Sequence, residues 1–397
     1  MLANQGTHAP CAPASERADR LVVVESGRDG FSAFLPMPLP PEPPVRIEPA
    51  TQVLLDEANQ ALGRLDGVAQ LLPDAGLFLY SYVRKEAVLS SQIEGTQSSL
   101  SDLLLFENES APGVPLDDVE ETSNYIVAMN HGLRRIRSGE LPLSNRLLRE
   151  VHAHLMQGVR GADKAPGEFR RSQNWLGGTR PGNARFVPPP HQEVLPAMSA
   201  LERFLHDQPE PTPILVKAAL AHVQFETIHP FLDGNGRVGR LLITLLLCAE
   251  GVLEQPLLYL SLYFKQHRQL YYDHLQAVRT EGAWEEWLAF FLEGVIAVAG
   301  SAIETARHIR DLVDRDRAVV NGFGRGAGSA VRVHEHAAQR IIVTAGGTAA
   351  QVKLSVPTVN AALHRLEEAG ILREVTGRRR GRVFAYDEYL TLLQEER

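Results

Sequence analysis

The stretch His229–Arg240 reads His-Pro-Phe-Leu-Asp-Gly-Asn-Gly-Arg-Val-Gly-Arg and lies between two apolar helical patterns. Residues 214–228 repeat apolar side chains at helical spacing, and a proline and a glycine end that pattern. Residues 241–247 form an apolar run broken only by one threonine, which predicts a second, buried helix. We expect this second helix to begin near Asn235 and Gly236, after a glycine-rich turn.

The predicted start of the second helix is suited to bind an anion. Its unpaired backbone N–H groups and its dipole attract negative charge, and Gly234 and Gly236 let phosphate oxygens approach closely. Arg237 and Arg240, three positions apart, add two positive charges on one face. Asp233 has the wrong sign for a phosphate site unless a cation lies between, and one carboxylate together with phosphate oxygens is a usual way to hold Mg²⁺.

His229 is the one group in the stretch whose ordinary pKa lets it accept a proton near neutral pH. The residues therefore predict a magnesium-nucleotide site with a general base at its mouth. The alternative is a solvated loop that happens to carry histidine and arginine. The stretch also resembles the signature of the Fic family, His-x-Phe-x-Asp-Gly-Asn-Gly-Arg-x-x-Arg, with no departure, whereas a Walker loop is absent from the sequence.

The resemblance implies an adenylyltransferase that moves AMP from ATP to a Tyr, Thr or Ser hydroxyl of a target protein, with the chain itself as one candidate target. It implies that His229 takes the hydroxyl proton and that Asp233 binds Mg²⁺. It also implies that the nucleotide phosphates are held by Gly234, Asn235, Gly236, Arg237, Gly239 and Arg240.

Residues 167–190 are the one long non-helical stretch in the central region, and Pro181-Gly182-Asn183 is a turn signal within it. Short extended pieces over 175–180 and 184–187 predict a hairpin. In the Fic resemblance this hairpin is the flap, which lies over the active site and offers a strand edge to the target polypeptide. The flap positions over the nucleotide are Asn183, Ala184, Arg185 and Phe186. The alternative role for Phe186 is to hold the hairpin shut.

Two aromatic pairs follow the signature. Tyr271 and Tyr272 are adjacent, so we expect one to be buried while the other stacks on or hydrogen-bonds an adenine, as the resemblance implies. Trp284 and Trp287 are three apart on one helix face, which is typical of core packing.

A second motif, Ser90-Ser91-Gln92-Ile93-Glu94-Gly95, lies far upstream. Ser91 and Glu94 could form a capping box that starts a helix, but the apolar spacing runs into the motif and Gly95 favours a helix end. On that interpretation Ser90 and Glu94 face the same way. The motif then resembles the inhibitory sequence Ser/Thr-x-x-x-Glu-Gly/Asn of Fic proteins, in which the glutamate pairs with the second signature arginine, here Arg240.

Composition limits the class of protein. The chain has 397 residues, a net charge of −8 and an ordinary apolar fraction, which argues against wholesale binding to nucleic acid or membranes. Its two cysteines, Cys11 and Cys248, provide neither a disulfide framework nor a zinc site and fit a reducing cytoplasm. We expect no signal segment and no stretch of membrane-spanning length.

The predicted fold is mainly α: a Fic-type helical domain with a β-hairpin flap, a helical amino-terminal region and a small winged helix-turn-helix at the carboxy terminus. Residues 1–30 are expected to be a disordered leader, 31–130 the amino-terminal helical region with the inhibitory helix, 131–320 the Fic domain and its trailing helix, and 321–397 the winged-helix-like domain. The proline-dense segment 34–49 is expected to lie extended over a surface. Predicted helices cover 52–72, 78–93, 100–106, 143–159, 196–205, 214–228, 263–279, 284–292 and 294–319.

The glycine-dense segment 322–328 marks the last boundary. Beyond it, short helices over 348–354 and 358–369 and strands over 371–374 and 382–386 resemble a winged helix. Its second helix would be the recognition helix, and the arginines at 378–380 could meet phosphate. The alternative is a protein-interaction or dimerisation module with a solvated basic tip.

Several functions stay open at this point. Some Fic relatives transfer other groups, usually with an altered glycine-rich turn, but Gly234 and Gly236 are both present here. The same site could instead remove AMP from modified proteins, with Glu94 positioning water. A DNA-binding regulator with a nucleotide-sensing Fic domain is the alternative from another class, and a homodimer is one assembly left open.

Overall fold

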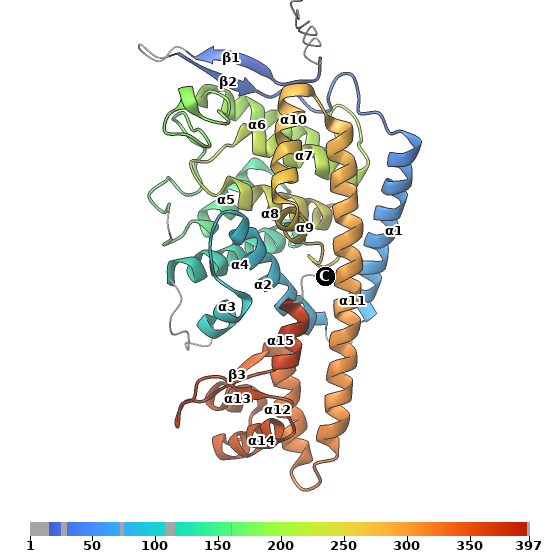
Figure 1. Cartoon of the computed structure of the whole chain (residues 1–397), viewed down its shortest axis with the longest axis vertical. Coiled ribbons are helices and arrows are strands. Elements are labelled where there is room, and N and C mark those ends of the chain that lie inside the picture. Colours follow the sequence, from blue (N-terminus) through green and yellow to red (C-terminus); the bar gives the residue numbers. More distant parts are fainter. Residues whose placement is uncertain (1–15, 25–29, 72–74, 108–115, 160, 395–397) are drawn as a thin grey trace, which may run out of the picture.

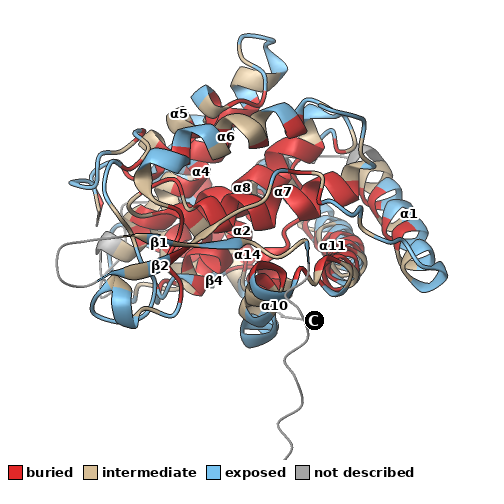
Figure 2. Cartoon of the chain, turned by 90° about the horizontal axis from the view of Figure 1, so that it is seen from above, coloured by how far each residue is buried: buried red, intermediate tan, exposed pale blue. Residues whose placement is uncertain are grey.

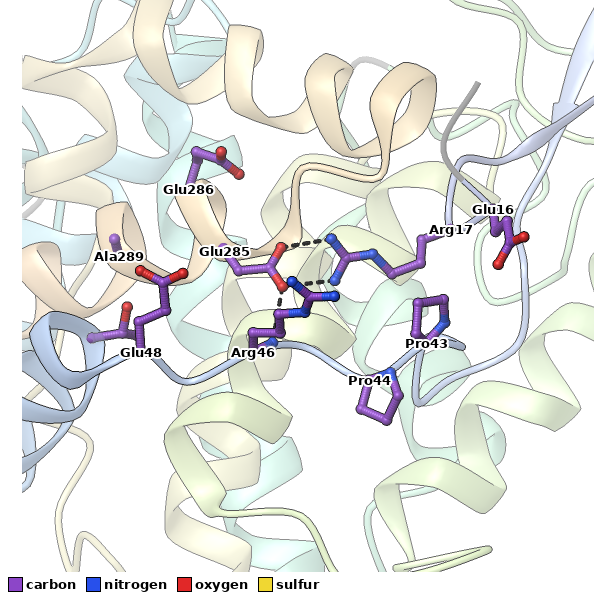
Figure 3. A pocket seen from close by; sticks show the side chains of 10 residues that line it. Glu16, Arg17, Pro43, Pro44, Arg46, Glu48, Glu285, Glu286 and Ala289 are labelled. Carbon is purple, nitrogen blue, oxygen red and sulfur yellow. Dashed lines mark hydrogen bonds and ion pairs between the residues drawn. The ribbon is translucent and has the colours of Figure 1, made fainter. Parts of the chain in front are cut away.

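Two apolar helices, α7 (Ile214–Ile228) and α8 (Asn235–Ala249), lie at the centre of the computed structural model, and buried residues gather around them (Figures 1 and 2). The structure describes residues 16–24, 30–71, 75–107, 116–159 and 161–394. Every residue of α7 from Leu215 to Ile228 is buried, as expected for a helix that is apolar on all sides. Both helices lie where the sequence predicts them, and the fold is mainly α-helical as predicted.

Among the described residues six α-helices precede this centre, and the first four are α1 (Pro49–Leu71), α2 (Ala75–Ile93), α3 (Leu100–Glu107) and α4 (Leu116–Arg137). Helix α4 packs on α2, on α5 (Asn145–Leu155) and on α8, so it belongs to the core around the signature. The sequence analysis predicts no helix there and places a domain boundary between residues 130 and 131, which falls inside α4. The low mean hydropathy of α4 explains why its buried apolar face is not recognised in the sequence.

The remaining helices differ in detail from the predictions. Helix α6 (His191–Leu205) begins five residues earlier than expected, so its proline lies inside the helix. The helix predicted over 263–279 is divided at His267 into α9 (Ser261–Gln266) and α10 (Arg268–Glu281). The two helices predicted over 284–292 and 294–319 are one continuous helix, α11 (Trp284–Asn321), because Gly294 packs against Tyr263 without ending the helix.

Helix α11 runs along most of the molecule and packs on α1 (Figure 1). It contains an 18-residue window with a mean hydropathy of 1.6, so by length and composition it could cross a membrane, and the expectation that no such stretch exists is wrong. In the structure 56% of that window is buried within the protein. Trp284 and Trp287 are both in the core, as predicted.

Two strands, β1 (Arg20–Val24) and β2 (Phe31–Leu35), form an antiparallel hairpin with Arg20 opposite Leu35. Residues 20–24 are therefore not part of a disordered leader, because three consecutive valines of this strand pair with residues 31–33 of the second strand. Residues 1–15 and 25–29 of the predicted leader lie outside the described residues. The proline-dense segment that follows has no regular secondary structure and bends at residues 39–40 and 42–43, so it is not extended throughout as predicted. The Met37 carbonyl accepts a hydrogen bond from Gln224 of α7 at 2.8 Å.

The carboxy-terminal domain follows the turn at 322–326 and contains three strands and four helices. Its elements in order are α12 (Ala327–Arg340), β3 (Ile342–Thr344), α13 (Ala345–Val352), α14 (Val356–Glu368), β4 (Arg373–Glu374), β5 (Val383–Ala385) and α15 (Asp387–Gln394). The antiparallel sheet has the order β3-β5-β4. The sequence analysis predicts α13, α14 and the last two strands but omits α12, β3 and α15.

Candidate active site

The signature forms a tight loop between α7 and α8. His229 ends α7 in a left-handed conformation (φ 50°, ψ 60°), and Gly234 precedes α8 in the same region at φ 74°. The Asn235 amide closes the loop, since its oxygen accepts the Phe231 N–H and its nitrogen donates to the Phe231 carbonyl, both at 2.8 Å. The Asn235 side chain therefore holds the loop that presents the first turn of α8, and its predicted contact with the nucleotide stays a prediction.

His229 lies in a surrounding that keeps its imidazole neutral. Burial, and then the nearby charges of Arg170 and Arg279, lower the pKa of His229 to about 3. Its Nδ1 is buried and has no hydrogen-bond partner among the described residues. A neutral ring with a free nitrogen is a proton acceptor, as the sequence analysis predicts for this residue.

Arg170, which the sequence analysis does not single out, fixes the position of this histidine. The buried guanidinium donates to the carbonyl oxygens of His229 at 2.9 Å and Ile228 at 3.3 Å. It also donates to the carbonyls of Ser172 at 3.1 Å and Pro189 at 2.6 Å, which lie at the two ends of the flap. One buried cation thus ties the end of α7 to both roots of the flap. Carbonyl ligands of this kind leave no sequence motif.

His152 of α5 is a second residue that the sequence analysis missed. Its Nδ1 accepts the Gly167 N–H at 2.8 Å, so its Nε2 carries the proton and donates to the Asp233 carbonyl at 3.1 Å. The ring stacks on Phe231, with centroids 3.8 Å apart and planes inclined by 5°. Burial lowers the pKa of His152 to about 4, which keeps this single tautomer at neutral pH. His152 thereby supports the backbone of the loop.

Asp233 and Arg237 lie next to each other at the start of α8. The Asp233 carboxylate accepts the Gly234 N–H at 2.6 Å, and its other contact is the Arg237 guanidinium at 3.7 Å. The Asp233 side chain is 40% exposed and can reach a ligand outside the loop. Arg237 is buried and donates to Glu121 of α4 at 3.1 Å. No group of three metal-binding side chains occurs among the described residues, so a metal here would need oxygens from another molecule.

Arg240 is held by the upstream motif. Its Nε donates to Ser90 Oγ at 2.9 Å, and its Nη2 donates to the Ser90 carbonyl at 2.8 Å and to Glu94 Oε1 at 2.9 Å. The Arg240 side chain is only 2% exposed, whereas that of Glu94 is 34% exposed. The predicted pairing of Glu94 with Arg240 is thus present. Helix α2 runs through Ser91 and ends at Ile93, which confirms the helix end and rules out a capping box.

The Glu94 carboxylate occupies the anion position of α8. A Cβ added to Gly236 would lie 2.1 Å from Glu94 Oε1, so the carboxylate rests directly on the first turn of the helix. Burial raises the pKa of Glu94, but the charge and hydrogen bond of Arg240 outweigh it, and the pKa lies below its ordinary value. Glu94 is therefore an anion at neutral pH. Gly95, at φ 103°, lets the chain turn away after it.

Glu226 is a buried carboxyl behind the loop. Burial raises the pKa of Glu226 to about 7, and its Oε1 has no hydrogen-bond partner among the described residues. A Cβ on Gly239 would lie 2.4 Å from that oxygen, so Gly239 serves close packing of α8 on α7. The predicted contact of Gly239 with the nucleotide stays a prediction beside this packing role.

The flap is shorter than predicted. One bridge joins Leu176 to Phe186, and a 3₁₀ turn (Pro181–Asn183) replaces the extended ends of the hairpin. The Asn183 side chain closes this turn by accepting the N–H groups of Thr179 at 3.0 Å and Arg180 at 2.9 Å. Phe186 is buried, which supports the alternative that it holds the hairpin shut.

The flap also contacts elements outside it. The Phe186 ring lies 5.6 Å from Phe34 of β2 and 3.9 Å from the Arg279 guanidinium. Ala184 is half-buried, and Arg185 is exposed and lies 3.4 Å from Asp273 of α10. The Val187 carbonyl accepts the Phe34 N–H at 2.9 Å, so β2 is joined to the flap. Of the four predicted flap residues, Asn183 and Arg185 are exposed.

The two tyrosines of α10 separate as expected. Tyr271 is buried, and its hydroxyl donates to His222 Nε2 at 2.9 Å, because His222 Nδ1 donates to the Gly239 carbonyl. Tyr271 is thus a core residue, as expected for one member of the pair, and its predicted contact with the nucleotide stays a prediction. Tyr272 is only partly buried, and burial followed by the charge of Glu94 raises its pKa. Tyr272 is the member of the pair that borders the Glu94 site.

Comparisons with known proteins agree with this geometry. Residues 53–134 match the family described as Fic/DOC family N-terminal, and residues 142–247 match the Fic/DOC family. Curated relatives from Culex quinquefasciatus and Aedes aegypti, both called protein adenylyltransferase Fic, are 30% identical over 247 residues. That alignment covers 60% of this chain and 45% of either relative, so the chain spans less than half the length of these relatives.

Solved structures share the fold. A Fic family protein from Desulfovibrio desulfuricans G20 is similar with a TM-score of 0.56 and 21% identity, covering 86% of this chain and 97% of that one. A Fic domain-containing signaling protein from Bacteroides thetaiotaomicron VPI-5482 has a TM-score of 0.51 and 21% identity, covering 64% of this chain and 97% of the other. The upstream helices and the signature loop thus match the two domain models of the Fic/DOC family, and residues 53–134 and 142–247 are its amino-terminal and Fic domains.

Proposed function

We propose that this protein is an adenylyltransferase that transfers AMP from ATP to a hydroxyl group of a protein and that Glu94 inhibits it. The observation that carries the proposal is the position of the Glu94 carboxylate, which lies on Gly236 and pairs with Arg240 at 2.9 Å. A site that binds its own carboxylate at a helix start and an arginine is built for an anion. The names of the curated relatives supply the chemistry.

In the proposed reaction the acceptor oxygen forms a bond to the α-phosphorus of ATP. The bond from that phosphorus to the bridging oxygen of the β-phosphate breaks, and pyrophosphate leaves. The hydroxyl proton passes to a ring nitrogen of His229, which is neutral because its pKa is about 3. The first turn of α8 and Arg240 hold the phosphates, so most of the rate comes from positioning and electrostatics.

Asp233 fits the binding of Mg²⁺ together with the nucleotide. Its carboxylate is accessible and lies at the start of α8, where the phosphates would be bound. One carboxylate plus phosphate oxygens matches the ligands that Mg²⁺ prefers, and the ion would supply neutralisation of charge on the phosphates. Asp233 also fixes Gly234 through its hydrogen bond at 2.6 Å.

Asp233→Ala is expected to abolish AMP transfer and its dependence on Mg²⁺. Titration calorimetry with Mg²⁺-ATP and the rate of incorporation over a Mg²⁺ series measure both effects. Asp56→Ala, which removes an exposed carboxylate on α1, is the matched control and should behave as wild type. Unchanged affinity and turnover in Asp233→Ala would exclude this carboxylate as the ligand.

Arg170→Lys is expected to slow AMP transfer by roughly 100-fold, because a small displacement of a catalytic group costs about that much. The lysine keeps the charge but cannot reach the four carbonyl groups that Arg170 contacts. ATP affinity should change little, since Arg170 lies behind the loop. Arg171→Lys, at the exposed neighbouring position, is the control. A normal rate in Arg170→Lys would show that the contacts do not position His229.

The rate of AMP transfer is not expected to fall as the pH is lowered through 6.5. His229 is active as the neutral base, and a pKa of about 3 means that lowering the pH from 8 to 5 leaves it unprotonated. A profile of the initial rate between pH 5 and 8, at saturating ATP and with unfolding monitored at each pH, checks this. A loss of activity centred near pH 6.5 in folded protein would contradict the assigned surroundings of His229.

Removal of AMP from modified proteins is the second candidate for this site. The observation that favours it is the exposure of the Glu94 carboxylate, which could position water at the α-phosphorus. Incubation of pre-labelled protein with wild type and Glu94→Gln separates the two, since removal would require the carboxylate and transfer would not. We also propose that the protein is located in the cytoplasm.

A further inference from the structure

The inhibitory helix is held at both ends by different parts of the chain. At its carboxy-terminal end, Ser90 and the adjoining Glu94 hold Arg240. At its amino-terminal half, the buried Ser81 hydroxyl lies 3.3 Å from the Tyr389 hydroxyl of α15. The distance along α2 from Ser81 to Glu94 is about 20 Å at 1.5 Å per residue. Figure 1 shows α2 running from the carboxy-terminal domain toward α8.

Three further contacts join the carboxy-terminal domain to this region. The Arg340 guanidinium of α12 lies 5.3 Å from the centre of the Tyr80 ring on α2. The Gln394 amide of α15 donates to Ser101 of α3 at 2.9 Å. Helices α12 and α15 both pack on α2. The contact surface therefore involves two helices of the domain.

The carboxy-terminal domain, which packs on α2, also contacts the long helix α11. The Tyr386 hydroxyl donates to Asp316 at 2.6 Å and lies 3.2 Å from His334 Nε2 of α12. Arg315 of α11 forms an ion pair with Glu388 of α15 at 2.7 Å. Because α11 also packs on α1 and α7, the carboxy-terminal domain is fixed relative to the catalytic centre and can set the position of α2.

We propose that the carboxy-terminal domain is a regulatory element that holds Glu94 on Arg240 by gripping α2. Nearly all residues of α2 from Ser81 to Ser91 are buried, so the helix moves as a packed rod and not by local fraying. Weakening the grip frees the helix to shift, and the Glu94 carboxylate leaves the anion position. This inference rests on the proposed function, since it specifies what controls the inhibition.

The test is a double-mutant cycle on self-labelling from α-labelled ATP with the full chain. Tyr389→Phe with Arg340→Gln removes the hydroxyl and the cation that face α2 and leaves the packed ring of residue 389 in place. In the wild-type background this pair should raise labelling about three- to ten-fold; in the Glu94→Gly background it should change nothing. Arg373→Gln, which breaks an exposed ion pair with Asp387 in the same domain, is the control.

Equal effects in both backgrounds, or no effect in either, would overturn the proposal. Hydrogen exchange of the amides at 81–93 gives a readout that needs no activity, and it should be faster in the Tyr389→Phe/Arg340→Gln protein than in the control. If Glu94→Gly itself fails to raise labelling, the proposed inhibition is wrong, whereas unchanged exchange contradicts the grip alone.

A separate feature of this domain is a basic tip. Arg378, Arg379, Arg380 and Arg382 lie exposed between β4 and β5, and none has a carboxylate within 4.0 Å among the residues that the structure describes. Four unpaired arginines in five positions contrast with a chain of net charge −8. Exposed Asn360 and His364 of α14 provide polar side chains on the second helix of the pair. Helix α14 lies at the end of the molecule away from α8 (Figure 1).

We further propose that this surface binds duplex nucleic acid, because exposed guanidinium groups and a helix with exposed amide and imidazole groups match phosphates and base edges. Fluorescence anisotropy of a labelled 30-base-pair duplex of arbitrary sequence, at several salt concentrations, is the assay. Replacing Arg378, Arg379 and Arg380 with Gln should weaken binding at least ten-fold and reduce the salt dependence.

Replacing Arg64, Arg203 and Arg307 with Gln changes the net charge equally at exposed positions elsewhere, and this control should bind as wild type. Equal loss in both triple variants, or no binding of duplex at low salt, would overturn the proposal. Binding of an acidic polypeptide but not of duplex would overturn it in favour of a protein partner.

Discussion

Glu94→Gly raises AMP transfer by roughly 10- to 100-fold, the expected consequence of removing a charge-assisted hydrogen bond of about 1.5–3 kcal/mol. In the proposed inhibition the carboxylate competes with the phosphates of ATP for Arg240 and for the first turn of α8, on which it lies. We therefore expect the nucleotide to be held unproductively until the carboxylate leaves. Initial rates of self-labelling from α-labelled ATP measure the effect.

Three companion variants separate the charge from other changes at this position. Glu94→Gln retains the length of the side chain but loses its charge, so it should activate in part. Arg240→Ala should not activate, because it removes the partner of Glu94 and a ligand of the phosphates together. The double variant should resemble Arg240→Ala. Equal rates in wild type and Glu94→Gly would mean that the contact serves only to end α2.

His229→Ala is expected to reduce AMP transfer by roughly 10²- to 10⁴-fold, the usual contribution of a general base. Affinity for ATP should persist, since the imidazole does not hold the phosphates. Alanine is unfavourable in the left-handed conformation of this residue, so His229→Asn provides a second variant that tolerates φ 50°. His308→Ala, exposed on α11, is the control. Wild-type rates in both His229 variants would exclude this residue as the base.

The sequence predicts the centre of the site because its information is local. The two helices, the turn between them and the charges on the first turn of α8 all lie within the signature and its flanks. The pairing of Glu94 with Arg240 spans 146 positions and follows from the family resemblance, not from any local pattern. The end of α2 at Ile93 could be predicted because Gly95 provides the positive φ that follows it.

Long-range contacts account for what the sequence did not predict. Arg170 donates to four backbone carbonyls from three segments. Because every residue type carries a backbone carbonyl, no residue in the sequence marks these contacts. Gly239 and Tyr271 are in positions that the motif suggests for the nucleotide, yet Glu226 and His222 fill the space beside them. The Asn235 amide likewise forms hydrogen bonds with the Phe231 backbone, because the buried backbone groups of the loop need partners.

Helix length is the other source of error. Gly294 suggests a break between two helices. In the structure Tyr263 packs so closely against this position of α11 that only a small residue fits there. Helix α4 escapes prediction because charged residues outnumber apolar ones in its first turns, although Glu121 there is the buried partner of Arg237. In both helices tertiary contacts outweigh the local helix propensity of the sequence.

The most direct test compares labels at two positions of ATP. The Glu94→Gly protein is incubated with Mg²⁺ and either α-labelled or γ-labelled ATP, and incorporation into protein is followed with Glu94→Gly/His229→Ala as the blank. Transfer of AMP predicts that the α label is incorporated, that the γ label is released with pyrophosphate, and that the blank remains unlabelled. Incorporation of the γ label, or of neither label into folded protein that binds ATP, would contradict the account.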